Sequence, residues 1–175
     1  FEPRQYVLKD GRIITVRSAE VNDAAAVLAY IRQVGGESDN LTFGAEELRI
    51  TIMDKEYYLY TAAHTPNQLC LLAESEGRLC GMLNFRGGTR PRIHHQGDFG
   101  LTVLRQFWGL GVGKALLERL LSWARASGLI RKVNLTVRAD NERAIALYTH
   151  MGFKVEGCVT RYFSIDGAFF DALFM

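Results

Sequence analysis

The 175-residue chain has little of several features, and each shortage excludes a class of protein. Its three cysteines, Cys70, Cys80 and Cys158, are odd in number and show no CxxC spacing, which argues against a disulfide framework and a zinc site. No apolar run approaches the roughly 20 residues of a membrane span, so we expect no membrane partner. The formal net charge is only +2, which makes no case for nucleic acid as a partner.

What the chain has is the composition of a globular domain. Hydrophobic residues make up 48% and charged residues 23% of it. The length suits one domain with a sizeable core, which we assign to residues 1–175. The first residues lack a signal-peptide pattern and the cysteines fit a reducing compartment, so we expect a cytoplasmic location.

Strand and helix patterns follow one another along the chain and predict a mixed α/β fold. Strands or hairpins are expected at 11–20, 68–86 (turning near Glu76 and Gly77), 94–103, 132–137 and 154–175 (turning at Asp166 and Gly167). Helices are expected at 18–31 with Ser18 as N-cap, 45–57, 112–126 and 140–153. The strands at 94–103 and 132–137 flank a helix and should be parallel. We therefore predict a mostly antiparallel mixed sheet with one central parallel βαβ crossover, flanked by helices.

Residues 107–121, FWGLGVGKALLERLL, place three glycines directly before an apolar helical pattern. Glycine turns at helix starts bind phosphate groups through free backbone amides. A P-loop would need glycine at Trp108 and a hydroxyl at Ala115, and a dinucleotide fingerprint would need its third glycine at Lys114 or Leu116. Both patterns fail, which leaves a pyrophosphate cradle or a tight turn that holds no ligand.

A second motif accompanies the glycines, and together they resemble motifs of the GNAT superfamily of acyl-CoA N-acyltransferases. Residues 101–117, LTVLRQFWGLGVGKALL, are similar to the motif with the core R/Q-x-x-G-x-G/A. Trp108 replaces the usual arginine or glutamine, as it often does in members similar to the ribosomal-protein-alanine N-acetyltransferases. Residues 141–153, NERAIALYTHMGF, match the family pattern N-x-x-A-x-x-L-Y-x-x-x-G-F. The similarity runs from about Gly97 to the last residue.

The resemblance implies an enzyme that transfers an acetyl group from acetyl-CoA to a primary amine by direct attack, with neither a metal nor a covalent enzyme intermediate. It also implies coenzyme contacts by the strand before the glycines, by the glycine turn and by one face of the next helix. These contacts are Val103, Leu104, Trp108, Gly109, Leu110, Gly111, Val112, Gly113, Lys114, Asn141, Ala144 and Tyr148. A free N–H near Val103 or Leu104 would stabilise the developing oxyanion.

Two side chains are implied as catalytic, each with a structural alternative. Tyr148 would protonate the leaving thiolate as general acid, unless it is only a packed aromatic. Asp98 would act as the base, directly or through a water, unless it is only a structural or rim carboxylate. A non-catalytic acyl-CoA-binding or regulatory module is the alternative to an enzyme.

The acceptor is less well defined than the donor. We expect a small-molecule amine or the N-terminal amine of a protein or peptide, and we leave a homodimer open. Glu37 and Asp39 would attract a cationic amine or are simply solvated loop charges. Tyr162 and Phe163 would form another wall of the acceptor site or belong to the core.

Three histidines are weaker candidates. His94 and His95 are neighbours on a predicted strand, where their side chains would point to opposite faces and make a poor pair of metal ligands. His150 follows Tyr148 and is a candidate for contact with the coenzyme.

Overall fold

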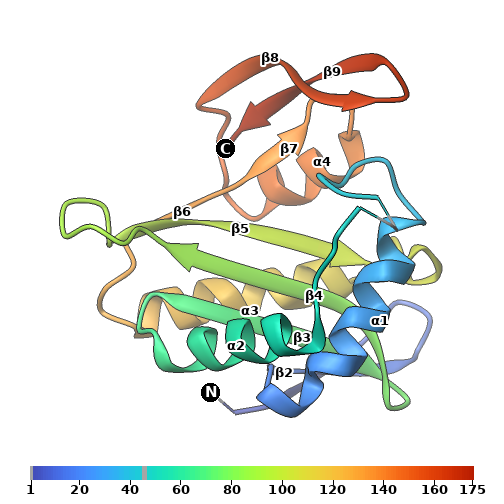
Figure 1. Cartoon of the computed structure of the whole chain (residues 1–175), viewed down its shortest axis with the longest axis vertical. Coiled ribbons are helices and arrows are strands. Elements are labelled where there is room, and N and C mark those ends of the chain that lie inside the picture. Colours follow the sequence, from blue (N-terminus) through green and yellow to red (C-terminus); the bar gives the residue numbers. More distant parts are fainter. Residues whose placement is uncertain (1, 45–46) are drawn as a thin grey trace.

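The computed structural model describes residues 2–44 and 47–175. Its helices and strands follow in the order β1 (Arg4–Val7), β2 (Ile13–Ser18), α1 (Ala24–Gly35), α2 (Ile52–His64), β3 (Gln68–Ser75), β4 (Arg78–Gly87), β5 (Gln96–Val103), α3 (Val112–Ala126), β6 (Lys132–Asn134), β7 (Thr136–Arg138), α4 (Glu142–His150), β8 (Gly157–Ile165) and β9 (Ala168–Phe174). Two 3-10 turns, η1 (Val21–Asp23) and η2 (Arg105–Phe107), precede α1 and the glycine turn. Figure 1 shows α1 and α2 against one face of the sheet and α3 against the other. None of the described helices is long and apolar enough to cross a membrane.

The strands form two sheets. The main sheet has the order β1-β2-β3-β4-β5-β6 and the second has the order β7-β9-β8. All neighbouring strands are antiparallel except β5 and β6, which are parallel. The predicted antiparallel sheet with one parallel crossover is therefore confirmed. The predicted single strand at 132–137 is wrong, because Leu135 pairs with Met175 and the chain continues as β7 of the second sheet.

Both predicted hairpins are confirmed, and the backbone of their turns explains why these residues predict a hairpin. Glu76 and Gly77 have φ values of 50° and 74°, and Asp166 and Gly167 have values of 49° and 80°. Two successive residues with positive φ form the turn whose twist matches a two-residue hairpin, and an acidic or amide residue followed by glycine adopts it readily.

The two N-terminal helices begin later than predicted. Ser18 ends β2 and does not cap α1. Nearer the helix, the carboxylate of Asp23 accepts the backbone N–H of Glu20 at 2.7 Å. Helix α2 begins after Thr51, whose hydroxyl accepts the Asp54 N–H at 3.1 Å while the Asp54 carboxylate accepts the Thr51 N–H at 2.9 Å. Such a reciprocal pair sets the start of a helix. The predicted start at Ala45 lies outside the described residues.

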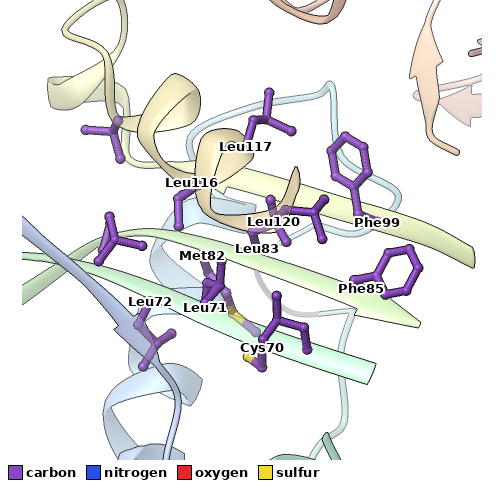
Figure 2. Close-up of a cluster of buried hydrophobic side chains, with 14 of the residues drawn as sticks. Cys70, Leu71, Leu72, Met82, Leu83, Phe85, Phe99, Leu116, Leu117 and Leu120 are labelled. Atoms are coloured by element: carbon purple, nitrogen blue, oxygen red, sulfur yellow. The ribbon is translucent and has the colours of Figure 1, made fainter. Parts of the chain in front are cut away.

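Helix α3 packs on the sheet through its predicted apolar stripe. Leu116, Leu117 and Leu120 are fully buried, and Figure 2 shows them over the strands. Gly81 of β4 lies beneath this helix, where a Cβ would come within 2.8 Å of Val112 and 3.1 Å of Leu116. This close approach holds α3, and hence the glycine turn at its start, against the sheet.

Candidate active site

The two sheets separate where β5 and β6 stop pairing. The parallel ladder ends at Asp98 and Asn134. Beyond this point β5 runs on to Val103. The segment after β6 turns away from β5, and its Leu135 exchanges backbone hydrogen bonds with Met175. The strands β5 and β7 therefore diverge, as Figure 1 shows, and we call the space between them the gap. Among residues 2–44 and 47–175, no strand pairs with the backbone groups of β5 that face the gap beyond Asp98.

The direction of the hydrogen bonds along β5 decides which amides face the gap. The Leu104 N–H donates to the Cys80 carbonyl of β4 at 3.0 Å. Because N–H direction alternates along an antiparallel strand, the Val103 N–H points away from β4 and toward the gap. An oxyanion donor at Leu104 is therefore wrong, and Val103 remains the candidate. The indole N–H of Trp108 donates to the Val103 carbonyl at 2.6 Å, which ties the glycine turn to this edge.

The glycine turn presents unpaired amides at the N-terminus of α3. Gly109 and Gly111 have φ values of 77° and 112°, which favour glycine, and a Cβ at either position would meet nothing within 4 Å. Within the described turn, the amides that donate to no backbone carbonyl are those of Gly109, Gly111, Val112, Gly113 and Lys114. A run of free N–H groups at the positive end of a helix is suited to a phosphate or pyrophosphate.

Two details of the predicted cradle change. The amides of Trp108 and Leu110 donate to carbonyls of the preceding 3-10 turn at 3.1 and 3.4 Å, so they are not free for a ligand. Gly113 makes room for protein and not for a ligand, because a Cβ there would stand 3.2 Å from Leu147 and 3.5 Å from Leu101. Its small size lets α3, α4 and β5 pack together.

The ring of Tyr148 is packed among other aromatic rings, whereas its hydroxyl is available to a ligand. Its side chain is 7% exposed, and its ring meets Phe99 and Phe153 nearly edge-on at centroid distances of 5.7 and 6.1 Å. Burial raises the pKa of its phenol to about 12. In the part of the chain that the structure describes, nothing forms a hydrogen bond with its hydroxyl. The phenol therefore keeps its proton near neutral pH and has it available for a substrate.

The other predicted contacts of α4 lie at its ends. Asn141 is the N-cap, and its side-chain oxygen accepts the Ala144 N–H at 3.2 Å. This bond leaves the side-chain NH₂ as the group that can reach a coenzyme. His150 is exposed at the last turn of the helix.

Asp98 is the last residue of β5 that pairs with β6, and it lies on the opposite face of the sheet from Tyr148. Its neighbour Phe99 contacts Tyr148, and adjacent side chains of a strand point to opposite faces. Asp98 therefore shares the face of Thr102, whose hydroxyl lies 2.9 Å from the hydroxyl of Tyr30 in α1. The candidate base and the candidate acid thus flank the gap from opposite sides of β5, and Asp98 is exposed.

The loop after α1 is tied to both sides of the gap. The Glu37 carboxylate accepts the Arg105 N–H at 2.6 Å and the Gln33 side-chain amide at 3.0 Å. The Asp39 carbonyl accepts a hydrogen bond from Arg138 of β7 at 3.1 Å. Both carboxylate oxygens of Glu37 thus accept hydrogen bonds that hold the loop in place, and the attraction of Glu37 and Asp39 for a cationic amine stays a prediction.

The remaining weaker candidates separate clearly. Phe163 is buried in the second sheet, whereas Tyr162 is 45% exposed, and their rings lie 5.0 Å apart. His94 and His95 lie in the turn before β5 and not on the strand as predicted, because β5 begins only at Gln96. The ring centroids of the two histidines are 6.5 Å apart.

Sequence reasoning missed two cations beside the glycine turn. The guanidinium groups of Arg105 and Arg143 lie 5.5 and 5.3 Å from the centre of the Trp108 ring. Positive charge next to free amides strengthens the preference for an anion. Arg143 stands in the second motif, but only the folded chain brings it to Trp108.

A glycine turn with free amides, a diverging pair of strands and a buried tyrosine lie around one gap, the arrangement that the sequence motifs led us to expect of an acyltransferase. The model of the acetyltransferase (GNAT) family matches residues 39–153, and the chain belongs to this family. The protein is therefore an N-acetyltransferase with the acyl-CoA N-acyltransferase fold, as its motifs predicted. Membership of an enzyme family also weighs against a non-catalytic binding module.

Relatives and solved structures agree over nearly the whole chain. The L-amino acid N-acetyltransferase AaaT of Escherichia coli (strain K12) is 29% identical over 166 residues, which are 93% of this chain and 96% of that protein. An acetyltransferase of the GNAT family from Streptococcus pneumoniae is 34% identical with a TM-score of 0.90, covering 92% of this chain and 96% of that one. The structure of yncA from Salmonella typhimurium with its cofactor acetyl-CoA has a TM-score of 0.80 at 19% identity, covers 92% and 91% of the two chains, and shows a likeness of fold.

Proposed function

We propose that the protein transfers an acetyl group from acetyl-CoA to a primary amine by direct attack in a ternary complex. The observation that carries this proposal is the gap, which is bordered by the free amides of the glycine turn and the unpaired edge of β5, with the Tyr148 ring packed on Phe99 of β5. Membership of the acetyltransferase family supports the donor. The name of the E. coli relative makes L-amino acids one acceptor class to test.

The chain has groups for each part of the donor. The free amides of Gly109 and of residues 111–114 would hold the pyrophosphate. Arg105 and Arg143 would add positive charge beside them. The edge of β5 at Val103 would form hydrogen bonds with the amide groups of the coenzyme's pantetheine arm, as an exposed strand does with an added strand. Acetyl-CoA supplies the thioester that is attacked.

The same residues account for the movement of protons and electrons. The neutral amine nitrogen attacks the thioester carbonyl carbon, a C–N bond forms, and the Val103 N–H stabilises the oxyanion. The C–S bond then breaks, and the leaving sulfur takes a proton from Tyr148. The proton lost by nitrogen goes to Asp98 or to a water that Asp98 holds. Solvent returns the proton to the Tyr148 phenolate.

The test is an initial-rate study with acetyl-CoA and a panel of amino acids, polyamines and peptides with free N-termini. The acetylated product should be measured by mass spectrometry, because the exposed Cys158 thiol would react with a thiol-detecting reagent. A ternary mechanism gives intersecting double-reciprocal lines. Parallel lines would exclude direct attack, and failure to bind acetyl-CoA at millimolar concentration by calorimetry would end the proposal.

A further inference from the structure

The two faces of β5 differ in what lies against them. Leu101 points toward α3, because a Cβ at Gly113 of that helix would stand 3.5 Å from its side chain. Phe99 points the same way, toward Tyr148 of α4. The proposed coenzyme site, built from the glycine turn and α4, therefore lies on this face. An acceptor that meets the thioester in the gap has the other face of β5 from which to approach.

The other face of β5 carries Asp98, Gly100 and Thr102. Asp98 and Gly100 are exposed and Thr102 is half-buried, so this row is open to a substrate. Thr102 directly precedes Val103, the candidate oxyanion donor. Asp98 stands five residues before Val103, which is roughly 16 Å along an extended strand. An amine that attacks a carbonyl held at Val103 therefore has Thr102 as the nearest polar side chain of β5, and Asp98 is out of its direct reach.

A buried phenol orients the hydroxyl of Thr102. The hydroxyl lies 2.9 Å from that of Tyr30 in α1, and Tyr30 is only 3% exposed. Burial raises the pKa of this phenol, so Tyr30 keeps its proton near neutral pH. A buried donor without an acceptor is unfavourable, and Thr102 Oγ1 is the acceptor within reach, so Tyr30 donates and Thr102 accepts. Because a threonine hydroxyl has two lone pairs and one proton, one lone pair and the proton remain for a ligand.

We propose that Thr102 is a catalytic residue of the acceptor site and that Tyr30 is a positioning residue that orients its hydroxyl. The inference rests on the proposed function and adds these two residues to it. An N–H of the attacking amine donates to the remaining lone pair of Thr102 Oγ1, which leaves the nitrogen lone pair free to attack the thioester carbonyl. As the C–N bond forms, the nitrogen loses this proton to Oγ1. The Thr102 hydroxyl passes its own proton to a water, so Thr102 ends the step unchanged.

Water completes the path from Thr102 to Asp98. The two residues are four positions apart on the same row, roughly 13 Å, which a chain of waters spans. The side chain of Asn84 in β4 lies over Gly100 between them, since a Cβ at Gly100 would stand 2.9 Å from Asn84 Oδ1. Within residues 2–44 and 47–175, the Asn84 side-chain amide has no hydrogen-bond partner, so it is available to hold one of these waters. The nitrogen thus loses one proton, and the Asp98 carboxylate gains one.

Removing the Thr102 hydroxyl while keeping the shape of the side chain tests the inference. In Thr102→Val we expect kcat/KM for the best amine of the panel to fall roughly 10- to 100-fold, the lower range for a positioned proton-transfer group. The affinity for acetyl-CoA, measured by calorimetry, should stay the same, because the proposed coenzyme site lies on the other face. Thr102→Ser keeps a hydroxyl and should stay within about 5-fold of wild type. Thr15→Val is the control, at a half-buried threonine of β2 in the same sheet.

A double variant separates a chemical role of the pair from a structural one. Thr102→Val alone leaves the buried Tyr30 hydroxyl unpaired and should lower Tm by roughly 3–10 °C. Tyr30→Phe alone should lower kcat/KM about 5-fold, the scale of one hydrogen bond. Combining the two substitutions removes both partners, which is nearly neutral for stability, so Tm should return toward the wild-type value while kcat/KM stays low. A pair with a purely structural role would regain both.

The outcomes separate the inference from the proposed function. An enzyme that acetylates an amine, but keeps its wild-type kcat/KM in Thr102→Val or regains it in the double variant, would overturn the inference and leave the N-acetyltransferase in place. If no amine on the panel were acetylated although acetyl-CoA binds, the proposed function would fail, and the role of Thr102 would fail with it.

Discussion

Packing fixes the position of the Tyr148 side chain and also sets the protonation state of its phenol. Phe99 and Phe153 hold the ring of Tyr148, and burial raises the pKa of its phenol to about 12. The phenol therefore stays protonated throughout the pH range in which an amine acceptor is assayed. A general acid must carry its proton before it can donate it, so the protonated phenol is compatible with the role proposed for Tyr148.

Removing the Tyr148 hydroxyl should separate catalysis from binding. In Tyr148→Phe we expect kcat to fall roughly 100-fold or more, since a positioned general acid contributes about 10²–10⁴-fold. The affinity for acetyl-CoA, measured by calorimetry, should change little because the ring packing is kept. The wild-type rate should also show no loss from phenol ionisation below about pH 10, because that loss begins only as pH nears the raised pKa. Tyr57→Phe, at an exposed position of α2, is the control, and an unchanged kcat in Tyr148→Phe would remove this role.

A glycine-to-alanine substitution, which adds one methyl group, tests whether the glycine turn binds the coenzyme. At Gly111 the φ of 112° is unfavourable for any side chain, so Gly111→Ala should cost about 1–3 kcal/mol of stability and weaken acetyl-CoA binding. Gly128→Ala is a matched control, because Gly128 has a φ of 66° at the other end of α3. It should lower the melting temperature while leaving the affinity for acetyl-CoA as it was. Equal affinities in the two variants would contradict a coenzyme role for the turn.

Helices and hairpins start and stop where neighbouring residues satisfy the backbone. The predicted bounds 112–126 agree with α3, because its apolar stripe is regular and a glycine stands just beyond each end. The predicted start of α2 is too early, because the reciprocal hydrogen bonds of Thr51 and Asp54 set the actual start. Local hydrogen bonding thus explains both the agreement and the miss.

The start of α2 gives a prediction at the scale of the element. Thr51→Ala removes the acceptor for the Asp54 N–H and should cost about 1 kcal/mol, which corresponds to roughly 2–4 °C in Tm for a domain of this size. Thr61→Ala lies inside the same helix, where its hydroxyl bonds only the carbonyl of Tyr57, and should change Tm much less. Thermal unfolding followed by circular dichroism measures both, and equal shifts would refute the capping role.

For the whole molecule, the decisive feature is that one chain builds two sheets that part at a single point. The proposed coenzyme site lies between β5, the glycine turn and α4, which different parts of the chain supply. A ligand held by all three should stabilise the fold as a unit. At 100 times its dissociation constant, acetyl-CoA should add about 2.7 kcal/mol of stability and raise Tm by roughly 5–10 °C.

Differential scanning fluorimetry checks this shift, with NAD at the same concentration as the control. NAD also carries a pyrophosphate, but the turn lacks the dinucleotide fingerprint, so we expect no comparable shift. A rise in Tm with NAD as large as that with acetyl-CoA would show that the turn recognises pyrophosphate without selecting the coenzyme.

The sequence by itself determined the features that depend on near neighbours. These are the two hairpin turns, the apolar stripe of α3, and the glycines whose positive φ values place free amides at the helix start. It also contained the two motifs by which the family and the candidate residues Tyr148 and Asp98 were predicted. Such features rest on backbone conformations and side-chain periods that a few adjacent residues decide.

The tertiary structure alone decided which groups remain available at the site. Leu104 is engaged because β4 supplies Cys80, and the sheet divides because Met175 competes for Leu135. The Glu37 carboxylate accepts a hydrogen bond from the backbone N–H of Arg105, 68 residues away. Arg86 lies opposite Asp98 only through the register of β4 and β5. Each outcome depends on hydrogen bonds or packing between segments distant in sequence, and no local pattern encodes these.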